Sequence, residues 1–380
     1  MSSCSVEMTS PVINNNSHEV IVASDDDGDG AEQGCRYAMQ LVTLTTLPMV
    51  LHAAIQLELF EIIAKAGPGA RLSAPQIVAQ LPTNNPEAAA MVDRILHLLA
   101  SHSVVTCSLA DDDGKEGSRL RMYGLASVSK YFVRNEDGVS FGPTMSLFQD
   151  HVIIDSWYKL KDAVIEGGVP FDKVHGMHLY EYLGKNPRFS QVFNTAMYSH
   201  TAIVVKQILK SYKGFQNLKQ VVDVGGGLGV TLNMITSKYP SIKGINFDLP
   251  HVLEHAPSYP GVEHVGGDMF DSVPGGDTIY MKSILHAWTD DDCSKLLKNC
   301  YRALPHDGKV IMVEEIHSEV PGTSAGSKSG GQFDLIMMSQ SPAGKERTKQ
   351  EFLALAKGAG FAGIRYDCYV CNFWVMEWFK

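Results

Sequence analysis

The fold class follows from one stretch of the sequence, Val221-Val222-Asp223-Val224-Gly225-Gly226-Gly227-Leu228-Gly229. In this stretch an apolar strand leads directly into a cluster of glycines. A helical pattern follows from Thr231 to Tyr239. Glycines permit a tight turn and let the backbone approach a ligand closely. Val230 stands where a pyrophosphate-binding loop carries its last glycine, so a dinucleotide fits poorly. The stretch therefore predicts a strand–loop–helix unit for another nucleotide-type ligand.

Four more short apolar segments follow this strand, and helical patterns separate most of them. The five strand candidates cover residues 220–224, 242–247, 262–265, 278–281 and 309–313. Strands that alternate with helices predict a mostly parallel sheet with helices on both faces, which is a Rossmann-like α/β domain. Residues 141–215, upstream of it, look mainly helical.

The N-terminal part of the chain has a different pattern. Residues 1–33 are expected to form a disordered tail, because their asparagine and aspartate runs cannot bury anything. From Tyr37 to Ala66 the pattern is a very apolar helix, with Pro48 as a kink or boundary. A helix that is apolar on more than one side must be covered by its own domain or by a second subunit.

Two shorter helices and a strand pair follow in this part. The helices begin at Ser73 and Pro86, and the strands cover residues 104–107 and 120–123. Helices followed by a hairpin predict a winged-helix-like unit. Such units often bind DNA, but the acidic balance and the lack of a basic recognition helix favour a structural or dimerisation module.

Composition limits the classes of protein that are possible. The 380 residues suffice for two domains, and 44% hydrophobic and 19% charged residues are typical of a soluble globular protein. Acids outnumber bases by 42 to 32, and this net charge of -10 argues against nucleic acid as a partner. We find no signal peptide and no apolar run as long as a membrane span. Seven cysteines, mostly in apolar surroundings, complete the case for a cytoplasmic protein with reduced thiols and no membrane partner.

Acidic residues at the ends of the predicted strands favour a positively charged ligand. Asp223 precedes the glycine loop, Asp248 ends the second strand at a position suited to ribose hydroxyls, and Asp268 follows the third strand. S-Adenosyl-L-methionine carries an amino group and a sulfonium, so an acidic loop suits it. Each feature alone is weak, because a glycine cluster is often only a turn and a single aspartate often only a helix cap. The ordered set predicts an adenosyl-cofactor site.

His286 lies just past the carboxyl end of the fourth predicted strand, where ligands of open α/β sheets bind. Glu314 ends the fifth strand and Glu346 lies in a polar loop, and either acid can hold the imidazole. A phenol with a pKa of about 10 must lose its proton to become a good nucleophile, and a histidine accepts it near neutral pH. For Glu315 and Arg347 we expect only a surface salt-bridge cluster. This chemistry requires no metal and we find no convincing ligand cluster, so we predict none.

At these residues the chain resembles the plant caffeic acid O-methyltransferase family of phenolic methyltransferases. The matching runs cover residues 218–227, 244–252, 257–270, 298–301, 344–348 and 355–361, and the resemblance spans most of residues 36–380. It implies a homodimer whose N-terminal helical domain lends residues to the partner's pocket. It implies His286 as general base, flanked by Glu314 and Glu346. It also implies contacts to S-adenosyl-L-methionine from Gly225, Asp248, Leu249, Asp268, Met269 and Lys282.

The chain departs from the family pattern near the substrate. Ala287 and Ser283 replace the usual Asp and Trp, while Phe148 and Ser341 replace polar amides. These changes favour a different, more apolar phenol, such as a phenylpropene, a lignan, a flavonoid or an alkaloid phenol. We predict that the residues lining the substrate pocket are Leu147, Phe148, Phe193, Met197, Ile336, Met337 and Ser341.

The sequence thus predicts a tail over residues 1–33, a helical dimerisation domain over 34–140 and a methyltransferase domain over 141–380. Two alternatives to phenol methylation stay open, namely N-methylation of an alkaloid amine and a non-catalytic paralog that binds the cofactor. Retention of His286, Glu314 and Glu346 argues against the second.

Overall fold

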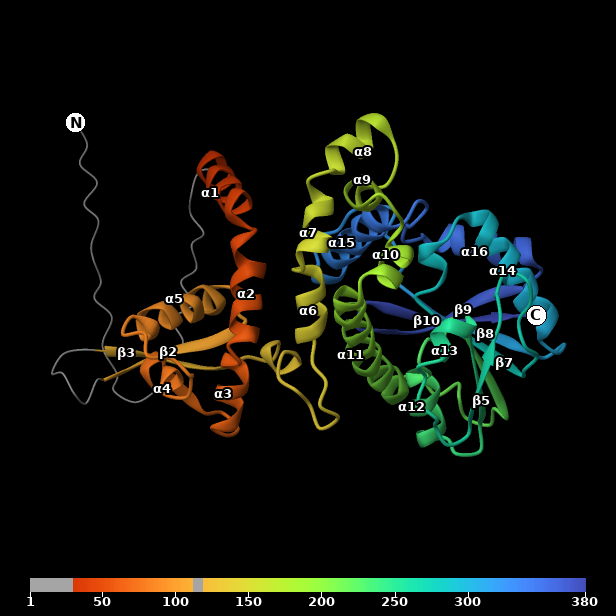
Figure 1. Cartoon of the computed structure of the whole chain (residues 1–380), viewed down its shortest axis with the longest axis horizontal. Helices are drawn as coiled ribbons and strands as arrows, with labels where there is room; N and C mark the ends of the chain where they lie inside the picture. The colour runs from red at the N-terminus through yellow and green to blue at the C-terminus, as the bar shows by residue number, and fades with distance from the viewer. Residues whose placement is uncertain (1–29, 112–118) are drawn as a thin grey trace, which may run out of the picture. The chain divides into compact units, whose positions relative to one another are not determined.

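The computed structural model of the protein describes residues 30–111 and 119–380, and its contacts form two compact units, one up to Val133 and one from Arg134 to Lys380 (Figure 1). Most of the predicted tail lies outside the described residues. Residues 30–33 are helical, however, so this part of the tail prediction was wrong. The domain limits at 33/34 and 140/141 stay predictions.

The first unit combines helices with a small antiparallel sheet of strand order β1-β3-β2. Its elements are α1 (Gly30–Thr43), α2 (Thr46–Gln56), α3 (Leu59–Lys65), β1 (Arg71–Ser73), α4 (Ala74–Val78), α5 (Ala88–Ser101), β2 (Val105–Asp111), β3 (Arg119–Leu125) and the 3₁₀ turn Ser129–Tyr131. The predicted hairpin is present as β2 and β3. The third strand, β1, was missed because three residues are too few to show an alternation of apolar and polar side chains.

The single long helix predicted from Tyr37 to Ala66 is three helices. The first break lies between Thr43 and Thr46, where α1 and α2 meet at a bend of 47°, and Pro48 lies in the first turn of α2, so a boundary is present at the predicted place. The second break, which was not predicted, lies at Glu58, whose φ of 53° cannot continue a helix. The apolar face of α3 and α5 supplies the core of this unit, with Leu59, Phe60 and Leu96 fully buried.

Helix α1 buries none of its residues within the chain, although Tyr37, Met39 and Val42 on it are large and apolar. Among the described residues, no single helix has the length and apolarity to cross a membrane. Helices α1 and α2 reach that limit only when counted together across a bend of 47°.

The second unit begins with helices and continues as alternating strands and helices. Its helices are α6 (Gly142–Phe148), α7 (His151–Trp157), α8 (Leu160–Glu166), α9 (Pro170–His175), α10 (Leu179–Lys185), α11 (Pro187–Ser211), α12 (Val230–Lys238), α13 (Pro250–Leu253), α14 (Asp290–Ala303), α15 (Ala325–Gln340) and α16 (Lys349–Ala359). Its strands are β4 (Gln220–Val224), β5 (Lys243–Asp248), β6 (Val262–Gly266), β7 (Thr278–Lys282), β8 (Lys309–Glu314), β9 (Gly363–Val370) and β10 (Phe373–Phe379).

The seven strands form one sheet of order β6-β5-β4-β7-β8-β10-β9. The first five pair in parallel and match the five predicted segments to within one residue at each end. Strands β10 and β9 add an antiparallel hairpin beside β8. Its turn places Cys371 and Asn372 at positive φ.

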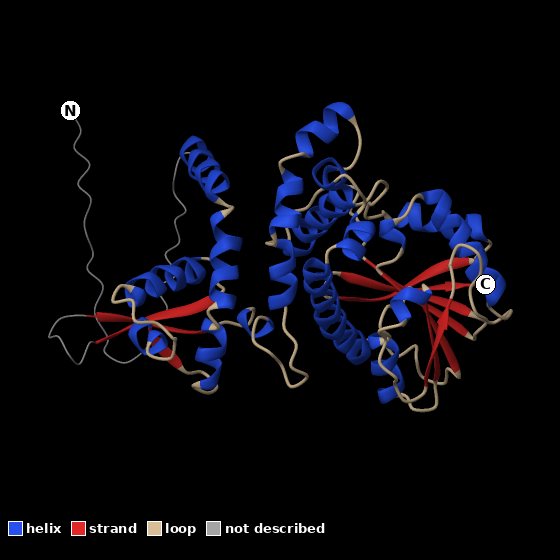
Figure 2. Cartoon of the chain, viewed as in Figure 1, coloured by secondary structure: helices blue, strands red, loops and turns tan. Residues whose placement is uncertain are grey.

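Helices cover both faces of the sheet (Figure 2). Successive side chains of a strand point to opposite faces. Val222 and Val224 of β4 pack into the cluster that contains α14 and α16. Val221 packs on the other side with α11 and α12. The parallel strands therefore end together at one edge, and this edge carries the polar residues described next.

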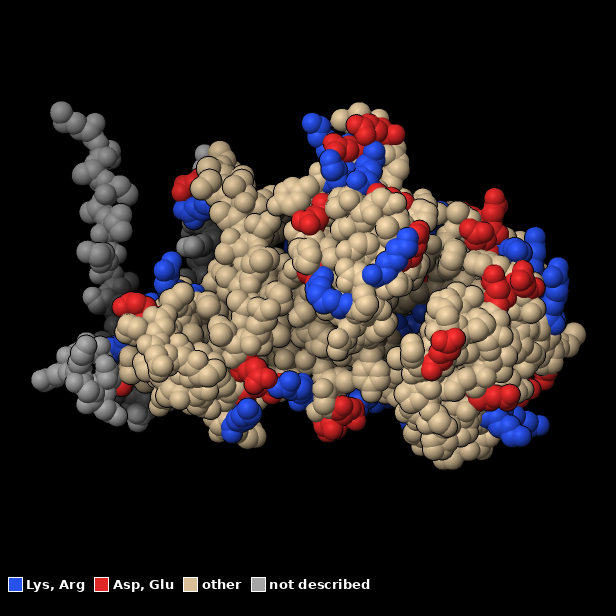
Figure 3. Space-filling model, in the orientation of Figure 1, with Lys and Arg blue, Asp and Glu red and all other residues tan. Residues whose placement is uncertain are grey.

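Charges of both signs are interspersed on the face of the molecule drawn in Figure 3. Independently of this view, local ion pairs join Lys185 with Glu181 and Lys206 with Glu136 and Asp137. Exposed pairs of this kind contribute little to stability.

Candidate active site

The glycine loop connects β4 to α12 through three residues with a backbone conformation that only glycine adopts readily. Gly225, Gly227 and Gly229 have φ values of 71°, 56° and 80°. Gly226 packs so tightly that an added Cβ would lie 2.1 Å from the Asn246 Oδ1 atom. The loop thus presents bare backbone at the ligand edge of the sheet, with no side chain in the way.

Asp248, at the end of β5, is bound to this loop. Its Oδ2 accepts a hydrogen bond of 2.8 Å from the Gly227 N–H, and its Oδ1 accepts one of 2.7 Å from the Leu249 N–H. Asp268, just after β6, accepts a 2.8 Å bond from the Phe270 N–H. These carboxylates are oriented by backbone amides, and both follow neighbouring parallel strands at the same edge. Two of the predicted cofactor-binding acids therefore lie where the sequence analysis placed them.

Asn246 is a site residue that the sequence analysis missed. It is fully buried in β5, its Nδ2 donates a 2.8 Å hydrogen bond to the Gly227 carbonyl, and it lies 3.0 Å from His264 Nδ1. A polar residue inside an otherwise apolar strand was the signal that could have found it. Asn246 and Asp248 therefore hold the two backbone polar groups of Gly227, its carbonyl and its N–H, respectively.

Two ionisable side chains, Asp223 and Lys282, lie at the ends of the neighbouring strands β4 and β7. Burial raises the pKa of Asp223 to about 8, with a contribution from Asp248 in the same direction and an opposing one from Lys282. Burial lowers the pKa of Lys282 to about 8, and the Glu314 and Asp223 carboxylates oppose this shift. The Lys282 Nζ lies 5.6 Å from the centre of the Phe373 ring. Burial thus favours the uncharged form of both side chains.

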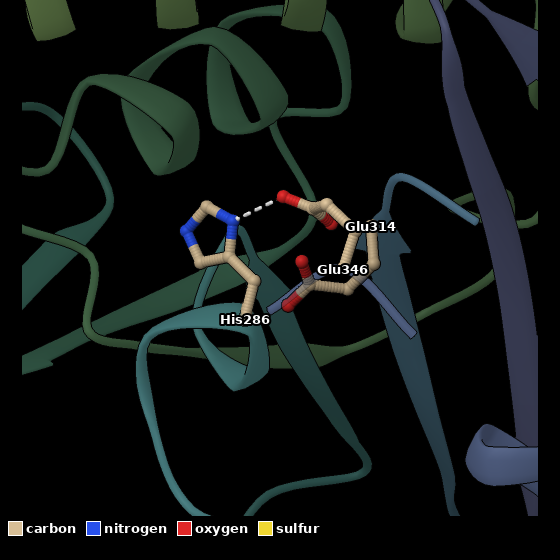
Figure 4. A group of neighbouring side chains, drawn as sticks. All are labelled: His286, Glu314 and Glu346. Carbon is tan, nitrogen blue, oxygen red and sulfur yellow. Dashed lines mark hydrogen bonds and ion pairs between the residues drawn. The ribbon is translucent and has the colours of Figure 1, made fainter. Parts of the chain in front are cut away.

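His286 occupies a short 3₁₀ turn, Leu285–Ala287, directly after β7. Its Nδ1 lies 2.9 Å from Glu346 Oε1 (Figure 4). Glu314 closes the same turn from β8, because its Oε1 accepts 2.8 Å bonds from the N–H groups of Ile284 and Leu285. The turn is entered through Ser283, whose φ is 56°. The three predicted catalytic side chains are therefore together.

The electrostatics of this group favour a strong base. Burial lowers the pKa of His286, but the hydrogen bond to Glu346 and the charges of Glu314 and Glu346 outweigh it, so the pKa lies above its usual 6.5. Burial raises the pKa of Glu314, and His286 opposes that rise. An imidazole whose Nδ1–H donates to a carboxylate keeps Nε2 free to accept a proton.

The loops that carry His286 and Glu346 are joined through their backbones. The Lys345 N–H donates a 3.0 Å bond to the His286 carbonyl, and the Ser341 hydroxyl donates a 2.9 Å bond to the Ala287 carbonyl. Arg347 donates to the carbonyls of Leu285 and Trp288. The relative position of the two catalytic side chains thus depends on the whole pair of loops.

The expectation that Glu315 and Arg347 form a surface salt-bridge cluster was wrong. Arg347 is 1% exposed and Glu315 4% exposed. Arg347 pairs with Asp290 at 2.8 Å and holds the catalytic loop, because its planar guanidinium can serve several acceptors at once. Burial, then the Glu346 charge, raises the pKa of Glu315 to about 8, with His286 opposing. A charged residue in a predicted loop has the same sequence pattern whether it is buried or exposed, so the burial of these two residues could not be predicted.

The predicted substrate residues fall into two groups. Leu147, Phe193 and Met197 share one apolar cluster formed by α6, α7, α9, α10 and α11. Phe148 meets Phe333 of α15 edge to face, with ring centres 6.2 Å apart. Ile336 and Met337 are half-buried on α15, and Ser341 follows that helix. Ser341 has a definite contact, but to the His286 loop, so its hydroxyl is engaged in positioning that loop.

His200 of α11 is a further residue that sequence reasoning missed. Its ring lies 6.0 Å from that of Phe141 and 5.7 Å from that of Phe373. Burial lowers its pKa to about 3, and the charges of Lys282 and His286 act in the same direction. His200 thus favours its neutral form, and the charges of Lys282 and His286 are close enough to act on it.

The sheet is Rossmann-like, and its carboxyl edge carries a glycine loop, two strand-end aspartates and a histidine–carboxylate pair. These features are typical of α/β enzymes that bind a nucleotide-containing cofactor. Family models match an O-methyltransferase domain over residues 157–362 and an O-methyltransferase dimerisation domain over residues 39–135. The chain belongs to the O-methyltransferase family and is an O-methyltransferase.

Named relatives extend over nearly the whole chain. Catechol O-methyltransferase 1 of Solanum lycopersicum is 57% identical, covering 92% of this chain and 96% of that protein. A caffeic acid 3-O-methyltransferase of Catharanthus roseus is 56% identical with the same coverage. Among solved structures, the calicheamicin methyltransferase CalO1 with bound S-adenosylhomocysteine superposes with a TM-score of 0.75 at 21% identity, covering 93% of this chain and all of that one. That likeness concerns the fold alone.

Proposed function

We propose that the protein transfers a methyl group from S-adenosyl-L-methionine to a phenolic hydroxyl of a small plant-type metabolite, with His286 as the general base. The observation that carries the proposal is the 2.9 Å contact between His286 Nδ1 and Glu346 Oε1 at the ligand edge of the sheet. A lone histidine would be ambiguous, whereas one oriented by a buried carboxylate is prepared to accept a proton.

The residues at the edge fit the donor. Gly225 and its neighbours offer bare backbone, while Asp248 and Asp268 are held in place by amide donors, so Asp248 can accept from ribose hydroxyls. Leu249, Met269 and Lys282 complete the proposed set, with Met269 packed against the core. When bound, S-adenosyl-L-methionine supplies an activated methyl group on a sulfonium.

The chain's own work is then to orient the acceptor and remove its proton. His286 Nε2 takes the phenol proton, the imidazolium is stabilised by Glu346, and Glu314 holds the turn that carries the ring. Because the donor is already activated, positioning the two reactants in line supplies much of the remaining rate enhancement.

We propose that no metal takes part in this reaction. The sequence analysis found no ligand cluster, yet His286, Glu314 and Glu346 do offer ligand atoms within 4.8 Å of one another. These are the same groups that base catalysis uses. Treatment with a chelator should therefore leave turnover unchanged, and a loss of activity that added Mg²⁺ restores would refute metal independence.

The acceptor is proposed to be a small phenol. The curated relatives are named for catechol and caffeic acid, while Phe148 and the engaged Ser341 give this chain fewer free polar groups near the proposed pocket. Phenylpropenes, lignans, flavonoids and alkaloid phenols are therefore the first acceptors to test. We propose a cytoplasmic location on separate grounds, namely the apolar surroundings of most of the cysteines in the sequence.

We also propose that the protein is a homodimer. The match to a dimerisation domain over residues 39–135 supports this, as does the apolar surface of α1, of which no residue is buried within the chain. Sedimentation of the full-length protein at several concentrations measures the dimer directly. A monomer throughout the micromolar range would contradict the proposal.

One experiment tests the central proposal. The purified enzyme is incubated with S-adenosyl-L-methionine and a panel of phenols and amines, and products are identified by mass spectrometry. His286→Ala should lower turnover on a phenol by at least about a hundredfold, the usual contribution of a general base. His306→Ala, an exposed histidine, is the matched control. Methylation of amines alone would favour the N-methyltransferase alternative, and cofactor binding without any product would favour a non-catalytic paralog.

A further inference from the structure

The catalytic group has the composition of a metal site. His286, Glu314 and Glu346 come from three separate segments, yet one ligand atom of each lies within 4.8 Å of the others (Figure 4). An imidazole with two carboxylates is a ligand set that suits divalent ions such as Zn²⁺. Within residues 30–111 and 119–380, no other group of three or more His, Cys, Asp or Glu residues meets this condition.

Two buried oxygens at this group have no hydrogen-bond partner. They are Glu314 Oε2 and Glu346 Oε2, on side chains that are fully buried and 95% buried, respectively. Each carboxylate uses only its other oxygen, toward the backbone amides of the turn or toward His286. A buried carboxylate oxygen without a donor is costly, and a cation is one way of satisfying it.

An ion at this cluster would require a modest change in the existing geometry. Two adjacent ligands that each lie about 2.0–2.2 Å from a tetrahedral Zn²⁺ are about 3.3–3.6 Å apart, whereas His286 Nδ1 and Glu346 Oε1 are 2.9 Å apart. The proton between these two atoms is the one that an ion would displace. A carboxylate oxygen of Glu314 would be the third ligand, and water would take the fourth position.

We propose that this cluster binds Zn²⁺, or a similar divalent transition-metal ion, and that the bound ion inhibits methyl transfer. The inhibitory part rests on the proposed role of His286. When Nδ1 coordinates an ion, a neutral imidazole carries its proton on Nε2, so that Nε2 donates a hydrogen bond and cannot accept one. The acceptor's proton then has no base to go to.

Binding is tested first, without reference to activity. Full-length protein freed of metal by a chelator is titrated with ZnCl₂ by calorimetry, and with CoCl₂ by visible absorption, which reports nitrogen and oxygen ligation directly. Glu314→Gln should weaken Zn²⁺ binding at least about tenfold, since even loss of an outer-shell group has an effect of this size. Glu346→Gln serves as a second variant if Glu314→Gln does not fold.

Two controls separate this site from other metal-binding groups. Glu315→Gln removes the neighbouring buried carboxyl but leaves the three ligands, and Cys371→Ser removes an exposed thiol. Both should bind Zn²⁺ like the wild type. Unchanged affinity in Glu314→Gln and Glu346→Gln, or lost affinity in Cys371→Ser, would overturn the proposed site.

Activity is tested second. Zn²⁺ should inhibit the wild-type enzyme over the same concentration range in which it binds, and a chelator should restore turnover. Binding at the cluster without inhibition would overturn the inhibitory part and would also count against His286 as base. Absence of binding would overturn the metal site alone, because the proposed reaction needs no ion.

Discussion

Replacement of Glu346 with Gln tests the catalytic pair with the least change in shape. The variant keeps the size of the side chain but removes the negative charge 2.9 Å from His286 Nδ1. An amide oxygen can still accept the Nδ1–H bond, so the ring can keep its orientation. What is lost is the attraction between a carboxylate and the imidazolium that forms as the substrate proton is taken.

The size of the effect follows from the burial of the pair. The Glu346 side chain is only 2% exposed and that of His286 19%, so solvent screens the interaction little. Hydrogen bonds to charged groups contribute about 1.5–3 kcal/mol. If this stabilisation of the imidazolium is lost in the transition state, the turnover number should fall by about 10- to 150-fold.

The pH dependence supplies a sharper test than the rate alone. The base must be unprotonated, so activity falls as the pH drops through the pKa of His286. The Glu346 hydrogen bond and charge raise that pKa against the opposing effect of burial. Without the carboxylate the pKa should be lower, and the acid limb of kcat/KM against pH should move to lower pH while the plateau drops.

Initial rates on a phenol that the enzyme methylates, measured from pH 5 to 9, give both the position of the acid limb and the height of the plateau. Glu319→Gln, an exposed acid on the segment after β8, is the matched control. An acid limb that stays in place or moves to higher pH would refute the reasoning, whatever the plateau does. A plateau unchanged within twofold would show that Glu346 does not stabilise the protonated ring.

Three further perturbations follow from the geometry. Gly226→Ala should weaken S-adenosyl-L-methionine binding at least about tenfold by calorimetry, because the new Cβ would lie 2.1 Å from a buried amide oxygen of β5, whereas Gly331→Ala, with open space around it, should leave binding intact. Glu377→Gln should lower the free energy of unfolding in urea by about 1.5–3 kcal/mol, because this buried carboxylate accepts from a tyrosine, a lysine and an arginine, and an unchanged midpoint would contradict this. Asp334→Ala should lower kcat about tenfold, because it removes the 2.9 Å hydrogen bond that Asp334 Oδ1 accepts from the Glu346 N–H. Asp334→Asn keeps an acceptor at this position and should retain most of the rate.

The parallel sheet and the grouping of His286, Glu314 and Glu346 could be predicted because both leave local signals. Buried parallel strands are short apolar runs, and the five predicted runs match β4 to β8 to within one residue at each end. The carboxyl ends of such strands must meet at one edge, so Asp248, His286 and Glu314 had to lie near one another once the strand order was fixed.

The residues missed by the sequence analysis act through contacts far apart in the chain. His200 reaches the edge from α11, and its neighbours Phe141 and Phe373 lie 59 and 173 residues away by number. Arg347 looked like part of a solvent-exposed loop, yet it is buried against carbonyls from residues 285 and 288. Neither fact leaves a local pattern, because a polar residue in a loop has the same sequence signal whether it is buried or exposed.

The two catalytic loops explain why so many polar groups are buried here. Backbone carbonyls of Leu285, His286, Ala287 and Trp288 all accept hydrogen bonds from the segment 341–347. Within the turn, the Trp288 N–H donates to the Leu285 carbonyl, but the carbonyls of His286, Ala287 and Trp288 receive no bond from a backbone N–H of the turn and would be costly to bury alone. The second loop satisfies them, and doing so places Glu346 beside His286. Formation of the catalytic pair is therefore a consequence of satisfying the turn's backbone, and any change that separates the loops should reduce activity before it unfolds the domain.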